Sequence, residues 1–268
     1  LPFVLTTGTE VDDPARWWWL VVMVVAGSLF LVWEKAYLAR GKVAIIDFEL
    51  FGISTFRNGI LISSFYFAAL PATFIILTLF LQQGLGFSPV VAGMVTLPFA
   101  LISAYTSYRS GKVVHKRGRP LVVVGLLGVL AGFGLVVWAS FIVPDPFMPI
   151  AVAIAMTVAG AGGGAVISPN QTLMLEDIPV VQGGLAGSLA QVGQRIGTAI
   201  GLAAALSTFF YVLAEEANLT QSARYHDAFA VAFLVVVGLV STALVFALMD
   251  TRVRKSDETL ATSQVLDV

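Results

Sequence analysis

The chain has 268 residues, of which 58% are hydrophobic and 12% charged, with a net charge of −1. A soluble domain of this length carries about twice that share of charged residues, so the composition excludes an ordinary soluble protein and favours an integral membrane protein. Cysteine is absent and the two histidines, His115 and His226, lie far apart in the sequence, which excludes disulfides and argues against a metal site. No cofactor motif is present, and the near-neutral charge gives no reason to expect a nucleic-acid partner.

Long apolar segments predict seven transmembrane α-helices. About 20 residues at a rise of about 1.5 Å cross a hydrocarbon core of about 30 Å, and a backbone in lipid must satisfy its own hydrogen bonds. The predicted spans are residues 17–33, 58–82, 89–107, 120–142, 147–168, 185–212 and 227–249.

The distribution of lysine and arginine predicts the orientation. All but three of the fifteen basic residues fall in the loops 34–57 and 108–119 and in the tail after 249. Of the remaining three, Arg16 and Arg224 lie on the opposite side and Arg195 lies within a span. Because basic loops stay in the cytoplasm, we expect a multi-pass protein of the plasma membrane with a cytoplasmic C-terminus.

The span 58–82 is rich in aromatic residues and contains Pro71, which permits a kink. Its aromatic side chains are typical of lipid or core packing. They also fit a drug-binding cavity lined by rings and a few polar groups, for which Tyr66, Phe67 and Phe74 are the candidates.

The span 147–168 ends in a glycine-rich stretch, 160–164, followed by Ser168, Pro169, Asn170 and Gln171. The glycines allow close packing or local flexing, and Pro169 is expected to mark the end of the helix. Asn170 and Gln171 could cap that end or belong to a cytoplasmic mouth; capping is the preferred interpretation.

In the span 185–212, glycine recurs at intervals of four residues. Glycines with this spacing form a flat stripe on which another helix can approach closely. The predicted packing glycines are Gly187, Gly193, Gly197 and Gly201.

Arg195 points away from this stripe, because it lies two residues, or about 200°, from Gly193 and Gly197. Gln191 is four residues earlier and shares its face. A guanidinium near the middle of a span is costly unless it meets water or a partner. Arg195 is therefore either a structural residue bonded to another helix or, with Gln191, part of a polar translocation cavity. No aspartate or glutamate lies deep in a span, so proton coupling through a buried acid is not evident.

The loop Gly111-Lys-Val-Val-His-Lys-Arg-Gly-Arg119 resembles the signature loop of the major facilitator superfamily. Ser168-Pro-Asn170 and Gln194-Arg-Ile-Gly-Thr-Ala-Ile-Gly201 are similar to the last third of its fourteen-helix drug:proton antiporters, the EmrB/QacA type. The residues that match the loop motif are Gly111, His115, Lys116, Gly118 and Arg119. His115 departs from the motif, which has an aspartate there that helps to lock one conformation in the family.

The resemblance implies the C-terminal half of a transporter whose partners are the lipid bilayer, a missing N-terminal half, a lipophilic substrate and protons. It further implies that residues 1–57 hold the end of one linker helix, a second linker helix at 17–33 and a loop. Residues 58–249 would form a six-helix domain of two three-helix repeats, and 250–268 a tail. Two other functions stay open. One is a superfamily transporter of a metabolite, sugar or siderophore. The other is a polytopic scaffold or enzyme, although the sequence has no catalytic cluster.

Overall fold

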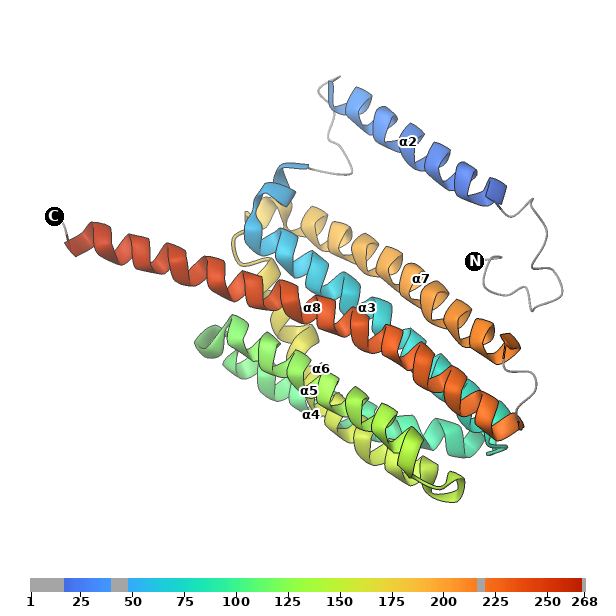
Figure 1. The fold of residues 1–268 in the computed structure, drawn as a ribbon. Coiled ribbons are helices and arrows are strands. Elements are labelled where there is room, and N and C mark those ends of the chain that lie inside the picture. The colour runs from blue at the N-terminus through green and yellow to red at the C-terminus, as the bar shows by residue number, and fades with distance from the viewer. Residues whose placement is uncertain (1–16, 40–47, 216–219, 267–268) are drawn as a thin grey trace.

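A computed structural model describes residues 17–39, 48–215 and 220–266. Every regular element in these ranges is helical, which confirms the all-α prediction (Figure 1). The long helices are α2 (Trp17–Ala39), α3 (Ser54–Leu79), α4 (Pro89–Arg117), α5 (Arg119–Ile142), α6 (Met148–Met174), α7 (Gly183–Glu215) and α8 (Gln221–Leu266). Short helical turns join them: η2 (Phe48–Gly52), η3 (Phe80–Gly84), η4 (Asp145–Phe147) and η5 (Val180–Gln182).

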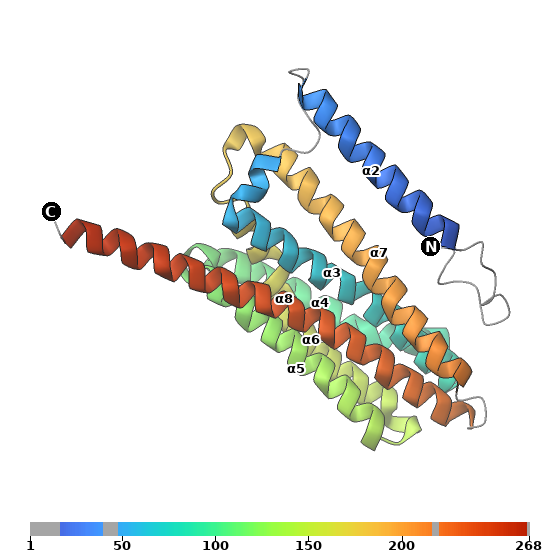
Figure 2. The same cartoon turned by 45° about the horizontal axis from the view of Figure 1, so that its top comes forward.

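Six helices, α3 to α8, are long and apolar enough to cross a membrane. The seventh predicted span corresponds to α2, in which the described apolar stretch is Val21–Phe30. Figures 1 and 2 show α2 outside the bundle formed by the other six. Its side chains Met23, Leu29 and Val32 are exposed, as expected for a helix surrounded by lipid. Residues 1–16, which include the end of the predicted preceding helix, lie outside the described ranges.

Local signals explain where several helices begin and end. The Ser88 side chain accepts a hydrogen bond from the Val91 amide, and α4 starts at Pro89. Gly118 joins α4 to α5 with φ = 55°, a left-handed conformation in which other residues are strained. Pro144 and Pro146 separate α5 from α6.

Several helices continue beyond the ends of the predicted spans; α4, for example, reaches Arg117 rather than residue 107. α6 runs through Pro169 to Met174. A proline is tolerated within a spanning helix because neighbouring helices and polar side chains compensate for the missing amide donor, and here Pro169 is itself buried. α8 continues past residue 249 to Leu266, so Asp250 lies in the helix rather than in a tail.

The six bundle helices form two related trios, α3–α5 and α6–α8. The second helix of each trio packs on the first helix of the other: α4 on α6, and α7 on α3. The third helices pack on the first helices, with α5 on α6, α8 on α3, and α5 against α8; α5 and α8 lie toward the viewer in Figure 2. The row α4–α6–α3–α7 is therefore backed by α5 and α8, and α4 and α7 are the least covered spans.

The glycine-rich stretch of α6 brings α4 and α5 close. A Cβ on Gly160 would lie 2.5 Å from the carbonyl oxygen of Phe99 in α4, and one on Gly162 would clash with Gly125 O and the Val129 amide of α5. A carbonyl oxygen or amide at such a distance belongs to a helix backbone and cannot move aside alone. The stretch therefore serves close packing, which is one of its two predicted roles.

We predict that Gly162→Ala lowers the thermal unfolding midpoint of the protein in detergent. The added methyl group must push α5 away from α6, and overpacking of this kind costs about 1–3 kcal/mol. Gly134→Ala in α5 is the matched control, because a Cβ there would meet no atom within 4 Å. Equal midpoints for the two variants would contradict this account of the α5–α6 contact.

Candidate functional site

One face of α7 packs on α3 through glycine. A Cβ on Gly193 would lie 2.9 Å from the Ser64 Oγ, and Cβ atoms on Gly197 and Gly201 would clash with the carbonyl oxygens of Ser64 and Ala68. The Thr198 hydroxyl adds a hydrogen bond of 3.0 Å to the carbonyl oxygen of Phe67 in α3. Three of the four predicted packing glycines thus lie in one helix–helix contact.

Gly187 does not belong to this contact, so its prediction as a packing glycine needs correction. A Cβ at this position would meet no atom within 4 Å. Gly187 lies less than two turns after the start of α7 at Gly183, before the close contact with α3 begins at Gly193. Gly187 also precedes Gly193 by six residues, or about 240° around the helix, so it does not continue the four-residue spacing of Gly193, Gly197 and Gly201.

Gln191 and Arg195 lie on the opposite, exposed face of α7. Arg195 is about 18 Å along the helix from Gly183 at about 1.5 Å per residue, well within the membrane-spanning length. Within the described residues, neither side chain makes a hydrogen bond or ion pair. In the structural alternative, Arg195 bonds to another helix, but no residue in the described part of this chain is such a partner.

The three aromatic candidates do not gather around Arg195. Tyr66 is only 1% exposed and is buried between α3 and α6, where its hydroxyl would lie 2.7 Å from a Cβ on Gly163. Phe74 packs edge-on against Phe99 at 5.3 Å, and Phe67 is half-buried beside Tyr66. In this conformation Tyr66 and Phe74 therefore pack between helices rather than line a cavity, because the absence of a side chain at Gly163 leaves room for the Tyr66 ring.

An open apolar groove lies between the N-terminal halves of α4 and α6. Its volume is about 480 Å³. The residues that line it are Val91, Met94, Val95, Pro98, Pro149, Ile150, Ala153, Ile154 and Thr157. Sequence reasoning did not identify this groove, because its walls come from two helices whose contact is not visible in either segment alone.

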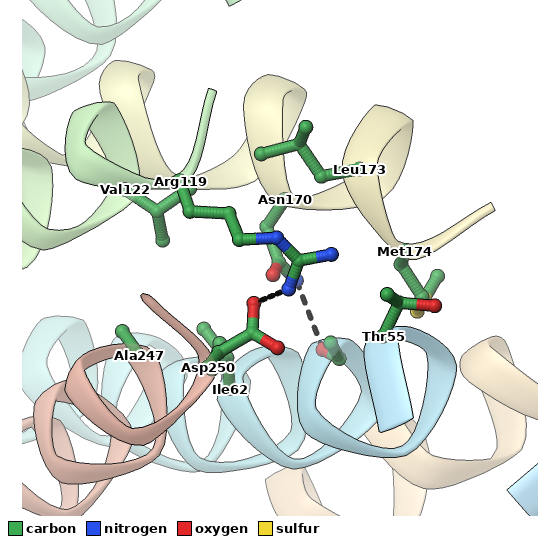
Figure 3. A pocket seen from close by; sticks show the side chains of 10 residues that line it. Thr55, Ile62, Arg119, Val122, Asn170, Leu173, Met174, Ala247 and Asp250 are labelled. Carbon is green, nitrogen blue, oxygen red and sulfur yellow. Dashed lines mark hydrogen bonds and ion pairs between the residues drawn. The ribbon is translucent and has the colours of Figure 1, made fainter. Parts of the chain in front are cut away.

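A buried polar cluster joins four helices at the other end of the bundle (Figure 3). Arg119 of α5 and Asp250 of α8 form an ion pair, and their side chains are only 7% and 9% exposed. Asn58 of α3 donates a hydrogen bond of 2.9 Å to Oδ1 of Asp250. Asn170 of α6 donates one of 2.9 Å to the carbonyl oxygen of Gly59 in α3. We call these four residues, Asn58, Arg119, Asn170 and Asp250, the end cluster.

The end cluster changes the interpretation of several sequence predictions. Asn170 bridges two helices instead of capping α6. Arg119, the last residue of the signature loop, is a buried ion-pair partner. Sequence reasoning did not identify Asp250 and Asn58 as site residues. Asp250 follows the last predicted span and Arg119 precedes another on the same predicted side of the membrane, and this placement could have indicated their ion pair.

Other residues of the signature loop are placed only in part. A Cβ on Gly111 would touch the Ser168 Oγ at 3.4 Å, so the start of the loop motif lies against α6. Gly118 provides the turn between α4 and α5. The side chains of His115 and Lys116 lie outside the described residues. In the described part of the chain, no three His, Asp or Glu residues lie close enough together to hold a metal ion.

Comparison with known proteins agrees with this arrangement of helices and loops. The sequence model of the Major Facilitator Superfamily matches residues 14–202. The chain belongs to the Major Facilitator Superfamily. Members of this superfamily are transporters, and this confirms the family predicted from the signature loop and from the glycine pattern of α7.

Its relatives include proteins named for drug or antibiotic transport. A protein named "Probable actinorhodin transporter" from Streptomyces coelicolor is 29% identical over 81% of this chain and 38% of its own length. The "Multidrug efflux pump LfrA" of Mycolicibacterium smegmatis is 27% identical over 78% of this chain and 41% of its own. The "Quinolone resistance protein NorB" of Staphylococcus aureus is 26% identical over 76% of this chain and 43% of its own length. The chain thus matches about two fifths of each relative.

We predict that Asp250→Ala strongly lowers the thermal stability of the protein in detergent. The substitution leaves the Arg119 guanidinium buried without its carboxylate, and breaking one side of a buried ion pair costs about 3–5 kcal/mol. In the double variant Arg119→Ala/Asp250→Ala, the loss should be clearly smaller than the sum of the two single losses. Arg252→Ala, at an exposed position two residues along α8, is the control and should have little effect. Additive losses would show that the two side chains do not depend on one another.

Proposed function

We propose that this chain is the C-terminal half of a proton-driven exporter of lipophilic drugs that works by alternating access. It would comprise one linker helix, α2, and the six-helix domain α3–α8. A second, N-terminal half would cover the row α4–α6–α3–α7, and the substrate would bind between the halves. The coverage of about two fifths of each relative supports the presence of further chain.

The observation that carries this proposal is the exposed polar face of α7. Arg195 and Gln191 lie in a membrane-spanning segment, exposed and without partners in the described chain. A charged side chain in a span almost always faces a bundle interior or a water-filled cavity. The row of helices that includes α7 should therefore face protein or water, which fits a translocation pathway.

The apolar groove between α4 and α6 supports a lipophilic substrate. It lies between two helices of the row that also contains α7, and its walls are almost entirely hydrophobic. Ligand sites of this size combine mainly apolar walls with a few polar groups that fix orientation. We propose that the groove supplies the apolar contacts and that Arg195 and Gln191 supply the polar ones.

The end cluster supports the proposed orientation. It ties together the start of α5, which follows the basic segment 108–119 at the end of α4, and the part of α8 that precedes Arg252. The basic segment 108–119 and the basic residues that follow Asp250 thus lie at one end of the bundle. We propose that this end is cytoplasmic, as the distribution of basic residues predicts, and that the protein resides in the plasma membrane.

Proton coupling requires a titratable group in the pathway, and no acid lies near the middle of a described span. We therefore place the coupling acid in the N-terminal half. A metabolite, sugar or siderophore transporter would need several polar groups in its site. The described face of α4 and α6 lacks them, which favours a lipophilic substrate.

The proposal predicts that Arg195→Ala in the full-length transporter slows efflux of lipophilic fluorescent dyes at least about tenfold. The loss of one charge-assisted contact of about 1.5–3 kcal/mol corresponds to this range. Initial rates would be measured in inverted vesicles with an imposed pH gradient, at equal amounts of protein in the membrane. Val192→Ala, at an exposed apolar position in the same turn, is the control. Unchanged efflux in the Arg195 variant would remove this residue from the pathway.

A further inference from the structure

The end of the bundle opposite to the end cluster holds a histidine between two hydrogen-bond acceptors. His226, in the second turn of α8, places its Nδ1 2.9 Å from the carbonyl oxygen of Ser140 at the end of α5. Its Nε2 lies 2.9 Å from Oδ1 of Asp145 in η4. The other carboxylate oxygen of Asp145 accepts a hydrogen bond of 2.8 Å from the Ser222 hydroxyl.

These contacts cannot all form with a neutral imidazole and an ionised carboxylate. A carbonyl oxygen only accepts hydrogen bonds, and so does a carboxylate. A neutral imidazole has one N–H and can donate to only one of them. The observed geometry therefore requires one additional proton on the pair His226–Asp145.

The surroundings favour this proton on the imidazole ring. The Asp145 side chain is 46% exposed and keeps contact with water, whereas His226 is 20% exposed, so the carboxylate can stay ionised. The ring of Phe80 in η3 packs edge-on against His226 at 4.9 Å. An imidazolium next to an ionised carboxylate also gives a strong, charge-assisted hydrogen bond.

The other charged groups near this end do not replace Asp145 as a partner. On α8, Arg224 donates through Nη2 to the carbonyl oxygen of Leu213, so it is turned toward α7. Asp227 follows His226 on α8, and Glu215 at the end of α7 is exposed. The nearby ends of α5 and η3 contribute no ionisable side chain.

We propose that His226 and Asp145 form a proton-binding site at the end of the bundle opposite to Arg119 and Asp250. When the pair binds one proton, the His226 ring can hydrogen-bond to both α5 and η4. These two bonds hold the start of α8 against the connection between α5 and α6. When the proton is lost, the neutral ring keeps only one of these two hydrogen bonds, and α8 is held less firmly at this end. By linkage, the conformation in which both hydrogen bonds form binds the proton more tightly than the conformation in which one is broken.

The proposal does not depend on the substrate or on transport. Under the orientation proposed above, the site faces the outside of the cell. There a proton-driven exporter meets its coupling ion, and the protonation of the site would follow the external pH. Histidine suits such a role because it changes charge between about pH 5 and about pH 8.

The direct test is the protonation state of the ring in the intact protein in detergent. With histidine labelled with ¹⁵N in the ring, the variant His115→Gln leaves the signals of His226 as those of a single histidine in this chain. At about pH 5.5, both ring nitrogens should carry a proton. Introducing Asp145→Asn in the same background should let the ring lose one of these protons at a lower pH, because the amide can donate to Nε2 while still accepting from the Ser222 hydroxyl. A neutral His226 at about pH 5.5 next to the native Asp145 would overturn the proposal.

The second readout is thermal stability as a function of pH. The His226 ring makes both hydrogen bonds only when it is charged. The stability that these bonds contribute is therefore present at low pH and lost as the pH rises. Between about pH 5 and about pH 8 the thermal midpoint should fall by about 3–6 °C more in the native protein than in His226→Gln or Asp145→Asn. His115→Gln is the matched control and should keep the native dependence. An unchanged pH dependence in His226→Gln would refute the site, whether or not the protein exports drugs.

Discussion

Close contact between helix backbones at glycine is the constraint on which the rest of this bundle depends. Lipid is as apolar as a leucine side chain, so helices in a membrane gain little from burying hydrophobic surface against one another. Their association depends on packing and a few polar contacts. In the row α4–α6–α3–α7, all three contacts use glycine, and between α6 and α3 it is Gly163 that leaves room for the Tyr66 ring. Gly160 of α6 lies against the backbone of α4, and Gly197 and Gly201 of α7 lie against the backbone of α3.

This packing leaves polar side chains few places within the bundle, and most of the described ones lie at its ends. α8 is tied to α5 at both ends: Asp250 pairs with Arg119 at one, and His226 reaches the Ser140 carbonyl at the other. Between these points, Phe233 of α8 packs on Phe133 of α5 at 5.4 Å. About 24 residues at 1.5 Å per residue separate the two polar ties, or roughly 36 Å. The back of the bundle is therefore fixed along the whole thickness of the membrane.

Among the described residues, Gln191 and Arg195 on the exposed face of α7 make no comparable side-chain contact with another helix. A domain whose α5–α8 layer is held together along its length can move as one body against a partner. This is what alternating access by rocking requires of each half. The arrangement accounts for a charged residue on an exposed helix face without any local compensation in this chain.

The sequence predicted the helices well because hydrocarbon imposes one solution on long apolar segments. The limits of the helices were predicted less well, since a helix does not end where the apolar residues end. α8 continues through Asp250, and α6 through Pro169. The exposed position of Arg195 followed from helical geometry alone, as did the packing role of Gly193, Gly197 and Gly201.

Contacts between helices remained beyond the reach of the sequence. Tyr66 is an amphipathic residue in an aromatic span, so its sequence context fits a cavity as well as helix packing. The structure places Gly163 opposite its ring, which favours packing. Asn58 and Asp250 are 192 residues apart, and nothing in either segment indicates the other. Polar residues at the ends of spans are easily interpreted as solvated, whereas here the packing of four helices buries them.

Energetics decide which way the exposed face of α7 must point. An arginine at the centre of a span costs at least about 2.5–3.5 kcal/mol in lipid, and a protein has a total stability of only about 5–15 kcal/mol. The buried Arg119 avoids a comparable cost through Asp250, but Arg195 has no partner within the described residues. Facing lipid would therefore consume a large share of the stability of the domain. Facing water or a second half of the protein would not carry this cost.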